Sequence, residues 1–163
     1  VVGRTLTRML LERGVPVTVV ALELTVVRRL RELGIDAVYG DARHPSVLGE
    51  ARVHEAGALV LTAASMKRRP EVVRIARESN PELRIFARAI RIREMNALRN
   101  AGADSVVTGE VEITIGLGDE LLAHLGASRE DVRTHRDRTR RELLGAVRAH
   151  RRASGEWRGT GRA

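Results

Sequence analysis

Residues 34–42 read Gly-Ile-Asp-Ala-Val-Tyr-Gly-Asp-Ala, and this stretch decides the fold. The apolar run predicts a short strand that closes on Gly40 and Asp41, at the end where open α/β sheets bind ligands. Glycine lets a planar ligand approach the backbone, and an aspartate accepts hydrogen bonds from an amino or hydroxyl group. An ordinary strand-to-helix loop, in which Asp41 or Ser46 caps the next helix, fits the same residues equally well.

Helices and strands are expected to alternate on both sides of this stretch. Apolar residues at helical spacing predict a first helix through Leu6, Met9 and Leu10, ended by Gly14, and a second at residues 24–33. The inner stripe expected for the second helix comprises Val26, Val27, Leu30 and Leu33. Between these helices, the β-branched run 15–20 predicts a strand buried on both faces.

The same alternation continues after residue 42. The predicted elements are a helix at 44–56, a strand at 58–63, a helix around 72–76, a strand at 83–89, a helix around Met95 and Leu98, and a strand at 105–108. Strict alternation with short loops predicts an α/β fold, a doubly wound parallel sheet with helices on both faces. Met95 and Phe86 are expected in its core.

The carboxyl-terminal third predicts helices. Leucine and isoleucine recur at helical spacing from Glu112, and Gly116 and Gly118 within that helix each cost about 1 kcal/mol relative to alanine. A bend or a packing partner is therefore expected. Residues 129–152 permit a polar helix, and 154–163 are expected to fray. The predicted division is a Rossmann-like domain at 1–110, a crossover or dimerisation helix at 111–127, and a basic helical tail at 128–163.

Composition limits the possible chemistry. The 163 residues include no cysteine, which excludes disulfides and thiolate sites, and the five histidines form no ligand-like cluster, so no metal is expected. No apolar run approaches the roughly 18 residues of a membrane span. Residues 128–163 carry 11 arginines against 5 acidic residues, whereas residues 1–127 carry 18 basic against 16 acidic residues. A solvated charged helix is favoured over nucleic-acid binding for that basic tail.

The beginning of the chain lacks part of a dinucleotide fingerprint. A Rossmann fold opens with a strand, a Gly-x-Gly-x-x-Gly turn and a helix, but here only the helix with Gly3 at its start is present. In a sheet of order 3-2-1-4-5-6 the absent strand is central, and without it two edges stay unpaired. The chain is therefore expected to be a fragment of a longer protein.

Seven short motifs, in order and with matching spacing over residues 1–126, resemble a known family. They are Gly3-Arg4-Thr5-Leu6, Glu12-Arg13-Gly14-Val15-Pro16-Val17, Leu30-Arg31-Glu32-Leu33-Gly34, Tyr39-Gly40-Asp41-Ala42, Asn80-Pro81-Glu82-Leu83, Ala87-Arg88-Ala89 and Ala101-Gly102-Ala103-Asp104. Together they resemble the TrkA-N domain, or RCK N-lobe, of Kef-type potassium/proton antiporters, Trk and Ktr potassium uptake systems and potassium channels.

The resemblance implies a ligand and the residues that bind it. The ligand would be NAD or NADH, with AMP, ADP or ATP as alternatives. The strands are counted here as in the complete family fold, so that the strand at 15–20 is the second and the strand at 58–63 the fourth. The implied site comprises Gly3 and Arg4 at the pyrophosphate turn, Ala21, Leu22 and Glu23 at the end of the second strand, Gly40, Asp41 and Ala42 at the adenine, Thr62 and Ala63 at the end of the fourth strand, and Arg88 toward the ligand or a dimer partner. No catalytic residue is implied.

Two positions depart from the family's pattern. Ala21 stands where members carry an acid for the ribose hydroxyls, and Ala64 and Ser65 replace an acidic pair ahead of the basic run 66–69. Loss of a charged hydrogen bond costs roughly 1.5–3 kcal/mol. Nucleotide binding is therefore expected to be weakened, shifted toward a more anionic ligand, or lost.

The leading functional hypothesis is a cytoplasmic, nucleotide-sensing regulatory domain at the inner face of the membrane. It would form a homodimer or higher oligomer and control a monovalent cation transporter, fused upstream or in trans. The alternatives are a degenerate dimerisation domain without a ligand and an NAD(P)-dependent oxidoreductase. Catalysis is disfavoured because Tyr39 is the only tyrosine, Lys67 has no Tyr-x-x-x-Lys partner, and His44 is explained by the start of a helix.

Overall fold

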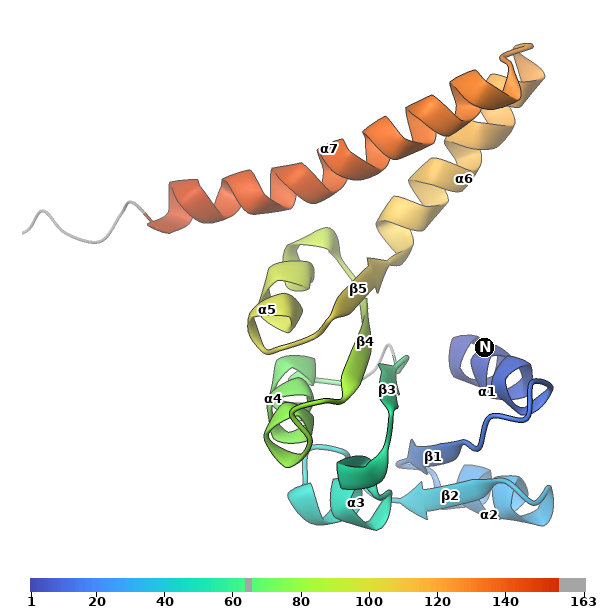
Figure 1. Ribbon diagram of the computed structural model, residues 1–163, viewed down its shortest axis with the longest axis vertical. Helices are drawn as coiled ribbons and strands as arrows, with labels where there is room; N and C mark the ends of the chain where they lie inside the picture. Colours follow the sequence, from blue (N-terminus) through green and yellow to red (C-terminus); the bar gives the residue numbers. More distant parts are fainter. Residues whose placement is uncertain (64–65, 156–163) are drawn as a thin grey trace, which may run out of the picture. The chain divides into compact units, whose positions relative to one another are not determined.

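A computed structural model describes residues 1–63 and 66–155, with side chains up to residue 145 (Figure 1). Helices and strands alternate through the first two thirds of the chain, as predicted. Two compact units are present, one of Val1–Arg88 with Leu98–Ser105 and the other of Ala89–Ala97 with the residues from Val106 onward. The predicted domain bounds at residues 110 and 127 stay a prediction.

The elements lie close to their predicted places. Through the first unit they are α1 (Val2–Leu11), β1 (Thr18–Ala21), α2 (Leu24–Glu32), β2 (Asp36–Tyr39), α3 (Pro45–Glu50), the 3-10 turn η1 (Val53–Glu55), β3 (Ala58–Leu61), α4 (Arg69–Ser79) and β4 (Arg84–Ala89). There follow the 3-10 turn η2 (Ile92–Glu94), α5 (Met95–Asn100), β5 (Ser105–Thr108), α6 (Gly109–His124) and α7 (Arg129–Gly155).

The paired strands are parallel, as the alternation predicts. β1 pairs with β2 from Thr18 opposite Asp36 to Ala21 opposite Tyr39. β3 pairs with β4, and the second sheet has the order β3-β4-β5. The described strands thus form two sheets, with β1 and β3 at their edges. Two strand edges without a partner in the described part of the chain are thus present, as expected.

The core of the first unit lies under one face of β3 and β4. Val72, Val73 and Ala76 of α4 are fully buried, as is Ile85 of β4. On the opposite face Phe86, which lies beside Val60 in the strand register, is exposed. The prediction that Phe86 is a core residue is therefore wrong, whereas Met95 is buried as predicted.

Three local predictions are corrected by the packing. Residues 15–20 do not form a strand buried on both faces. The strand β1 starts only at Thr18, which is exposed, and its other residues are half-buried. It also pairs with a neighbouring strand along one edge only. In α2 only Val27 is buried, while Val26 and Leu33 are exposed. The helix at 44–56 breaks at Arg52, whose φ of 55° is left-handed, and Asn80 Nδ2 donates to the carbonyls of Val53 and Ala56 beyond the break.

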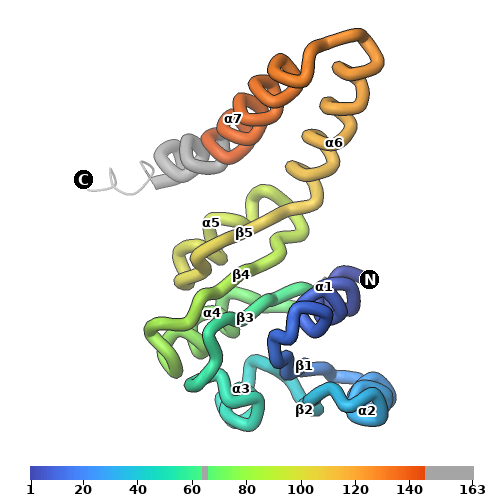
Figure 2. Tube along the Cα trace, turned by 45° about the vertical axis from the view of Figure 1, so that its right-hand side comes forward, coloured from blue at the N-terminus to red at the C-terminus, as the bar shows by residue number. Residues whose placement is uncertain are grey.

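In the second unit, α6 and α7 lie side by side as a helical hairpin (Figure 1, Figure 2). Arg136 of α7 donates to Asp119 at 2.6 Å, and Arg140 donates to Glu112 at 2.9 Å. α7 is the packing partner that a helix with internal glycines needs. Of the segment expected to fray, residues 156–163 lie outside the described residues.

Candidate functional site

The ends of β1 and β2 bring two of the predicted groups together. The backbone N–H of Gly40 donates to the carbonyl of Ala21 at 3.0 Å, so the loop after β2 lies against the last residue of β1. Carboxyl ends of parallel strands are where ligands bind in such folds. The structure therefore joins the predicted groups Ala21–Glu23 and Gly40–Ala42 at one end of a sheet.

Asp41 is held by a neighbour that sequence reasoning did not single out. Arg43 Nε donates to both carboxylate oxygens, at 3.1 and 2.9 Å, Arg43 Nη2 donates to Oδ2, and the backbone N–H of Arg43 donates to Oδ1 at 3.0 Å. The hydrogen bonds from the Arg43 side chain lower the pKa of Asp41 to about 2. The arginine two residues after the aspartate was the available sequence signal.

The alternative role of this loop as a helix cap is wrong for both residues proposed. α3 has His44 at its N-cap position, and no side chain there makes a capping hydrogen bond. Ser46 lies inside the first turn of the helix. Asp41 is thus neither a cap nor a free acceptor.

Gly40 is required by the protein's own packing. Its φ is +154°, and a Cβ at this position would lie 2.6 Å from Cγ2 of Val47. A side chain at residue 40 is therefore excluded by α3, whether or not a ligand approaches the backbone. Ala42, the last residue of the motif, is buried.

Gly3 lies close to the chain after β3. A Cβ on it would lie 2.9 Å from Oγ1 of Thr62, so α1 approaches the chain after β3 more closely than another residue would allow. Gly3 and Thr62 are thus brought together. Arg4, the next residue of α1, is exposed.

The end of β1 offers no acid at the ribose position. Ala21 is half-buried, and Leu22 after it is exposed. Glu23 has an extended backbone as the N-cap residue of α2, and its carboxylate caps none of the helix N–H groups. Ala21 thus provides no carboxylate for the ribose, and no hydrogen bond to the start of α2 holds the carboxylate of Glu23, two residues later, in place.

The chain after β3 contains a buried cation. The side chain of Arg69, at the start of α4, is buried, and its Nε donates to the carbonyl of Ala63 at 3.3 Å. Arg68 has a left-handed φ of 56° and pairs with Glu71 at 3.6 Å. The burial of Arg69 was not expected from its place in the basic run 66–69. Ala64 and Ser65 lie outside the described residues.

Arg88 is half-buried in β4. Within the described part of the chain it makes no hydrogen bond or ion pair. Its predicted role toward a ligand or a partner stays a prediction.

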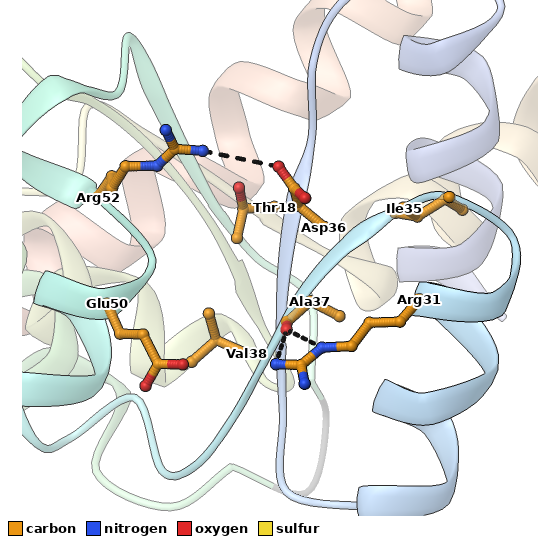
Figure 3. A pocket seen from close by; sticks show the side chains of 9 residues that line it. Thr18, Arg31, Ile35, Asp36, Ala37, Val38, Glu50 and Arg52 are labelled. Atoms are coloured by element: carbon orange, nitrogen blue, oxygen red, sulfur yellow. Dashed lines mark hydrogen bonds and ion pairs between the residues drawn. The ribbon is translucent and has the colours of Figure 1, made fainter.

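An open pocket of about 420 Å³ lies along β2 and contains none of the predicted site residues (Figure 3). Arg31 points across it and donates two hydrogen bonds, of 2.9 and 2.7 Å, to the carbonyl of Ala37. Arg52 pairs with Asp36 at 3.6 Å on its other side. Because Thr18 and Asp36 are the first residues of β1 and β2, the pocket lies at the amino-terminal ends of the strands, and it is a weaker candidate than the carboxyl ends, where such sheets bind ligands.

The described residues form neither a metal-binding cluster nor a membrane-spanning helix. The described residues contain no group of three or more potential metal-ligating side chains. No helix in the described part of the chain combines the length and apolar composition that a membrane span requires.

Comparison with known proteins identifies the fold. Residues 1–109 match the sequence model of the TrkA-N domain, which is more than half of the chain. The chain belongs to the TrkA-N domain family. This confirms the resemblance drawn from the seven motifs, and with it the expected Rossmann-like fold.

Two relatives of this TrkA-N domain are cation antiporters. The putative cation/proton antiporter YbaL of Escherichia coli is 37% identical over 112 residues, which are 69% of this chain and 20% of YbaL. The chloroplastic K(+) efflux antiporter 3 of Arabidopsis thaliana is 34% identical over 111 residues, which are 68% of this chain and 14% of that protein. The chain thus spans a fifth or less of the length of these relatives.

Solved structures extend the comparison. The TrkA-N domain of YbaL superposes with a TM-score of 0.69 at 35% identity, covering 71% of this chain and 86% of that domain. The GsuK channel bound to NAD gives 0.64 at 26% identity, over 71% of this chain and 21% of the channel. The Shewanella denitrificans Kef CTD in its AMP-bound form gives 0.71 at 23% identity over 89% of this chain and 88% of that chain, and it supports the fold alone.

Proposed function

We propose that this TrkA-N domain is a cytoplasmic, nucleotide-sensing regulatory domain of a potassium or other monovalent-cation transporter. The observation that carries the proposal is the joined end of β1 and β2, where Gly40 is bonded to Ala21. This is the position at which open parallel sheets bind nucleotides. One structural neighbour supports the choice of ligand, since it is a channel bound to NAD.

In this proposal, the second unit provides the dimer interface through which nucleotide binding affects the transporter. Four apolar side chains spaced four residues apart are 59–71% exposed: Ile113, Leu117 and Leu121 on α6, and Leu125 at its C-cap. A different face of α6 packs on α7, which explains why apolar residues occur around the helix. Contiguous exposed apolar side chains mark protein interfaces. We assign this stripe, called here the α6 stripe, to a second copy of the chain.

A regulator of this kind acts by population shift. A nucleotide with unequal affinity for two dimer geometries favours one of them, and a transporter joined to the dimer changes state with it. The domain itself catalyses nothing in this account. The relatives that share the domain are antiporters, which supports an antiporter as the regulated protein.

Isothermal titration calorimetry of the full chain against NAD, NADH, AMP, ADP and ATP tests the binding step. At least one nucleotide is expected to bind. Ala21→Trp, which fills the strand end, is expected to abolish that binding. Leu33→Trp, an exposed position at the other end of α2, is the matched control and is expected to bind as the unmodified chain does.

A ligand-free dimerisation domain is the alternative, favoured by the absence of an acid at Ala21. Binding of no nucleotide in the panel, together with an intact dimer, would establish it. Sedimentation velocity tests the dimer independently. Leu117→Asp is expected to give monomers, because it places a charge in the α6 stripe, whereas Ala123→Asp, on α6 but outside the stripe, is expected to stay dimeric. A dimeric Leu117→Asp variant would contradict the assignment.

A further inference from the structure

We propose that this site selects adenosine nucleotides that carry a phosphate on the ribose 2′-oxygen, and that Arg43 is the residue that determines this specificity. The inference rests on the proposed nucleotide site and names the class of ligand that it takes. In Rossmann folds an acid at the end of the second strand binds the ribose 2′-hydroxyl, whereas a nearby arginine accommodates a 2′-phosphate.

The acceptor for a 2′-hydroxyl is missing. The strand that corresponds to the second strand of the fold is β1, and its last residue is Ala21. A methyl side chain accepts no hydrogen bond, and Leu22 beside it is apolar and exposed. A ligand with a free 2′-hydroxyl therefore gains no charged hydrogen bond from Ala21 or Leu22.

A guanidinium lies in the loop that contacts this strand end. The bond from Gly40 to the carbonyl of Ala21 anchors the loop, and Arg43 follows three residues later. Asp41 holds Arg43 through Nε and Nη2, which orders the side chain before a ligand arrives. Of the two partners, Arg43 is the more accessible, with 38% of its side chain exposed against 19% for Asp41.

The pairing leaves part of the guanidinium available. Nη1 of Arg43 donates to no atom of the described residues, and phosphate accepts charge-assisted hydrogen bonds from such groups. Lys67 and Arg68, in the chain after β3, are exposed. The hydrogen bonds and charge of Asp41 raise the pKa of Arg43, and the charge of Glu71, which pairs with Arg68, adds to this.

Three small probes test the specificity without the nicotinamide half of a dinucleotide. They are 5′-AMP, adenosine 2′,5′-bisphosphate and adenosine 3′,5′-bisphosphate, titrated calorimetrically into the full chain. The 2′,5′-bisphosphate is expected to bind about tenfold more tightly than 5′-AMP, the gain typical of one charge-assisted contact. The 3′,5′ isomer has the same charge in a different place and is expected to resemble 5′-AMP.

Variants connect the preference to the residues. Arg43→Ala is expected to remove the preference for the 2′-phosphate, so that adenosine 2′,5′-bisphosphate and 5′-AMP bind with equal affinity, because the phosphate loses its guanidinium while the lost pairing with Asp41 affects both ligands alike. Ala21→Asp restores the missing acid and is expected to reverse the preference. Arg28→Ala, at an exposed position on α2, removes the same charge elsewhere in the unit and is expected to change neither affinity.

The outcomes separate this inference from the function on which it rests. Equal binding of the two bisphosphates, both tighter than 5′-AMP, would show unspecific attraction to charge and would overturn the inference. Tighter binding of 5′-AMP would overturn it as well, while leaving the nucleotide sensor intact. Binding of none of the three probes, nor of the dinucleotides, would contradict the proposed function itself.

Discussion

Asp104 joins three segments of the first unit through one carboxylate. Its Oδ2 accepts the backbone N–H of Ile85 at 2.7 Å and Nη2 of Arg77 at 2.7 Å. Arg77 also donates to the carbonyls of Pro81 and Gly102. The hydrogen bond from Ile85, with that from Arg77, lowers the pKa of Asp104. Asp104, the last residue of the motif at 101–104, thus connects α4 and β4 to the loop before β5.

Asp104→Ala is expected to lower the free energy of unfolding by about 1–3 kcal/mol, because the N–H of Ile85 loses its side-chain acceptor in a partly buried place. Urea denaturation measures the change. Asp36→Ala removes a carboxylate from an exposed pair with Arg52 and is the matched control, expected to cost less than about 1 kcal/mol. Equal losses in the two variants would contradict the role given to Asp104.

Asp41 makes stability depend on pH in the acid range. Its pKa in the folded state is about 2, below the ordinary value of 3.8, so the folded state binds its proton less readily than the unfolded state. The contribution is complete above the unfolded pKa and is lost as the pH falls from about 4 toward 2. As the pH falls through this range, the melting temperature of Asp41→Asn is expected to decline less than that of the unmodified chain. Parallel curves would contradict the Arg43 pairing.

At the scale of elements, α7 begins with a reciprocal cap. Ser128 Oγ accepts the backbone N–H of Asp131 at 3.1 Å, and the Asp131 carboxylate accepts the backbone N–H of Ser128 at 3.2 Å. The two side chains are also bonded to each other, and the hydrogen bonds from Ser128 lower the pKa of Asp131. This cap fixes where a polar helix starts, so that Arg136 and Arg140 reach α6.

Ser128→Ala is expected to destabilise α7 by about 1 kcal/mol, the usual cost of a lost N-cap. Amide hydrogen exchange in the first turns of α7 measures the fraying. Thr134→Ala, an exposed mid-helix change in the same element, serves as the control and is expected to leave exchange unchanged or slower, because alanine favours the helix. Unchanged exchange in Ser128→Ala would show that the cap is dispensable.

At the scale of the whole molecule, the strands are expected to differ in local stability, because they differ in the number of neighbouring strands. β4 has a strand on each side, and its Ile85 and Ala87 are buried. β1 has a neighbour on one side only, and none of its residues is fully buried. Backbone amides of β4 are therefore expected to exchange with solvent more slowly than those of β1. Equal protection of the two strands, measured by hydrogen exchange and mass spectrometry, would contradict this ranking.

The sequence by itself determined the alternation of helices and strands and their parallel pairing. These follow from apolar periodicity and from glycine positions, which act locally along the chain. Only the tertiary structure decided that Arg43 holds Asp41, that Arg69 is buried, that the helix after β2 breaks at Arg52 and that Phe86 is exposed. Those outcomes depend on which groups the folded loops bring within hydrogen-bond reach, and on which faces other elements cover, neither of which local spacing encodes.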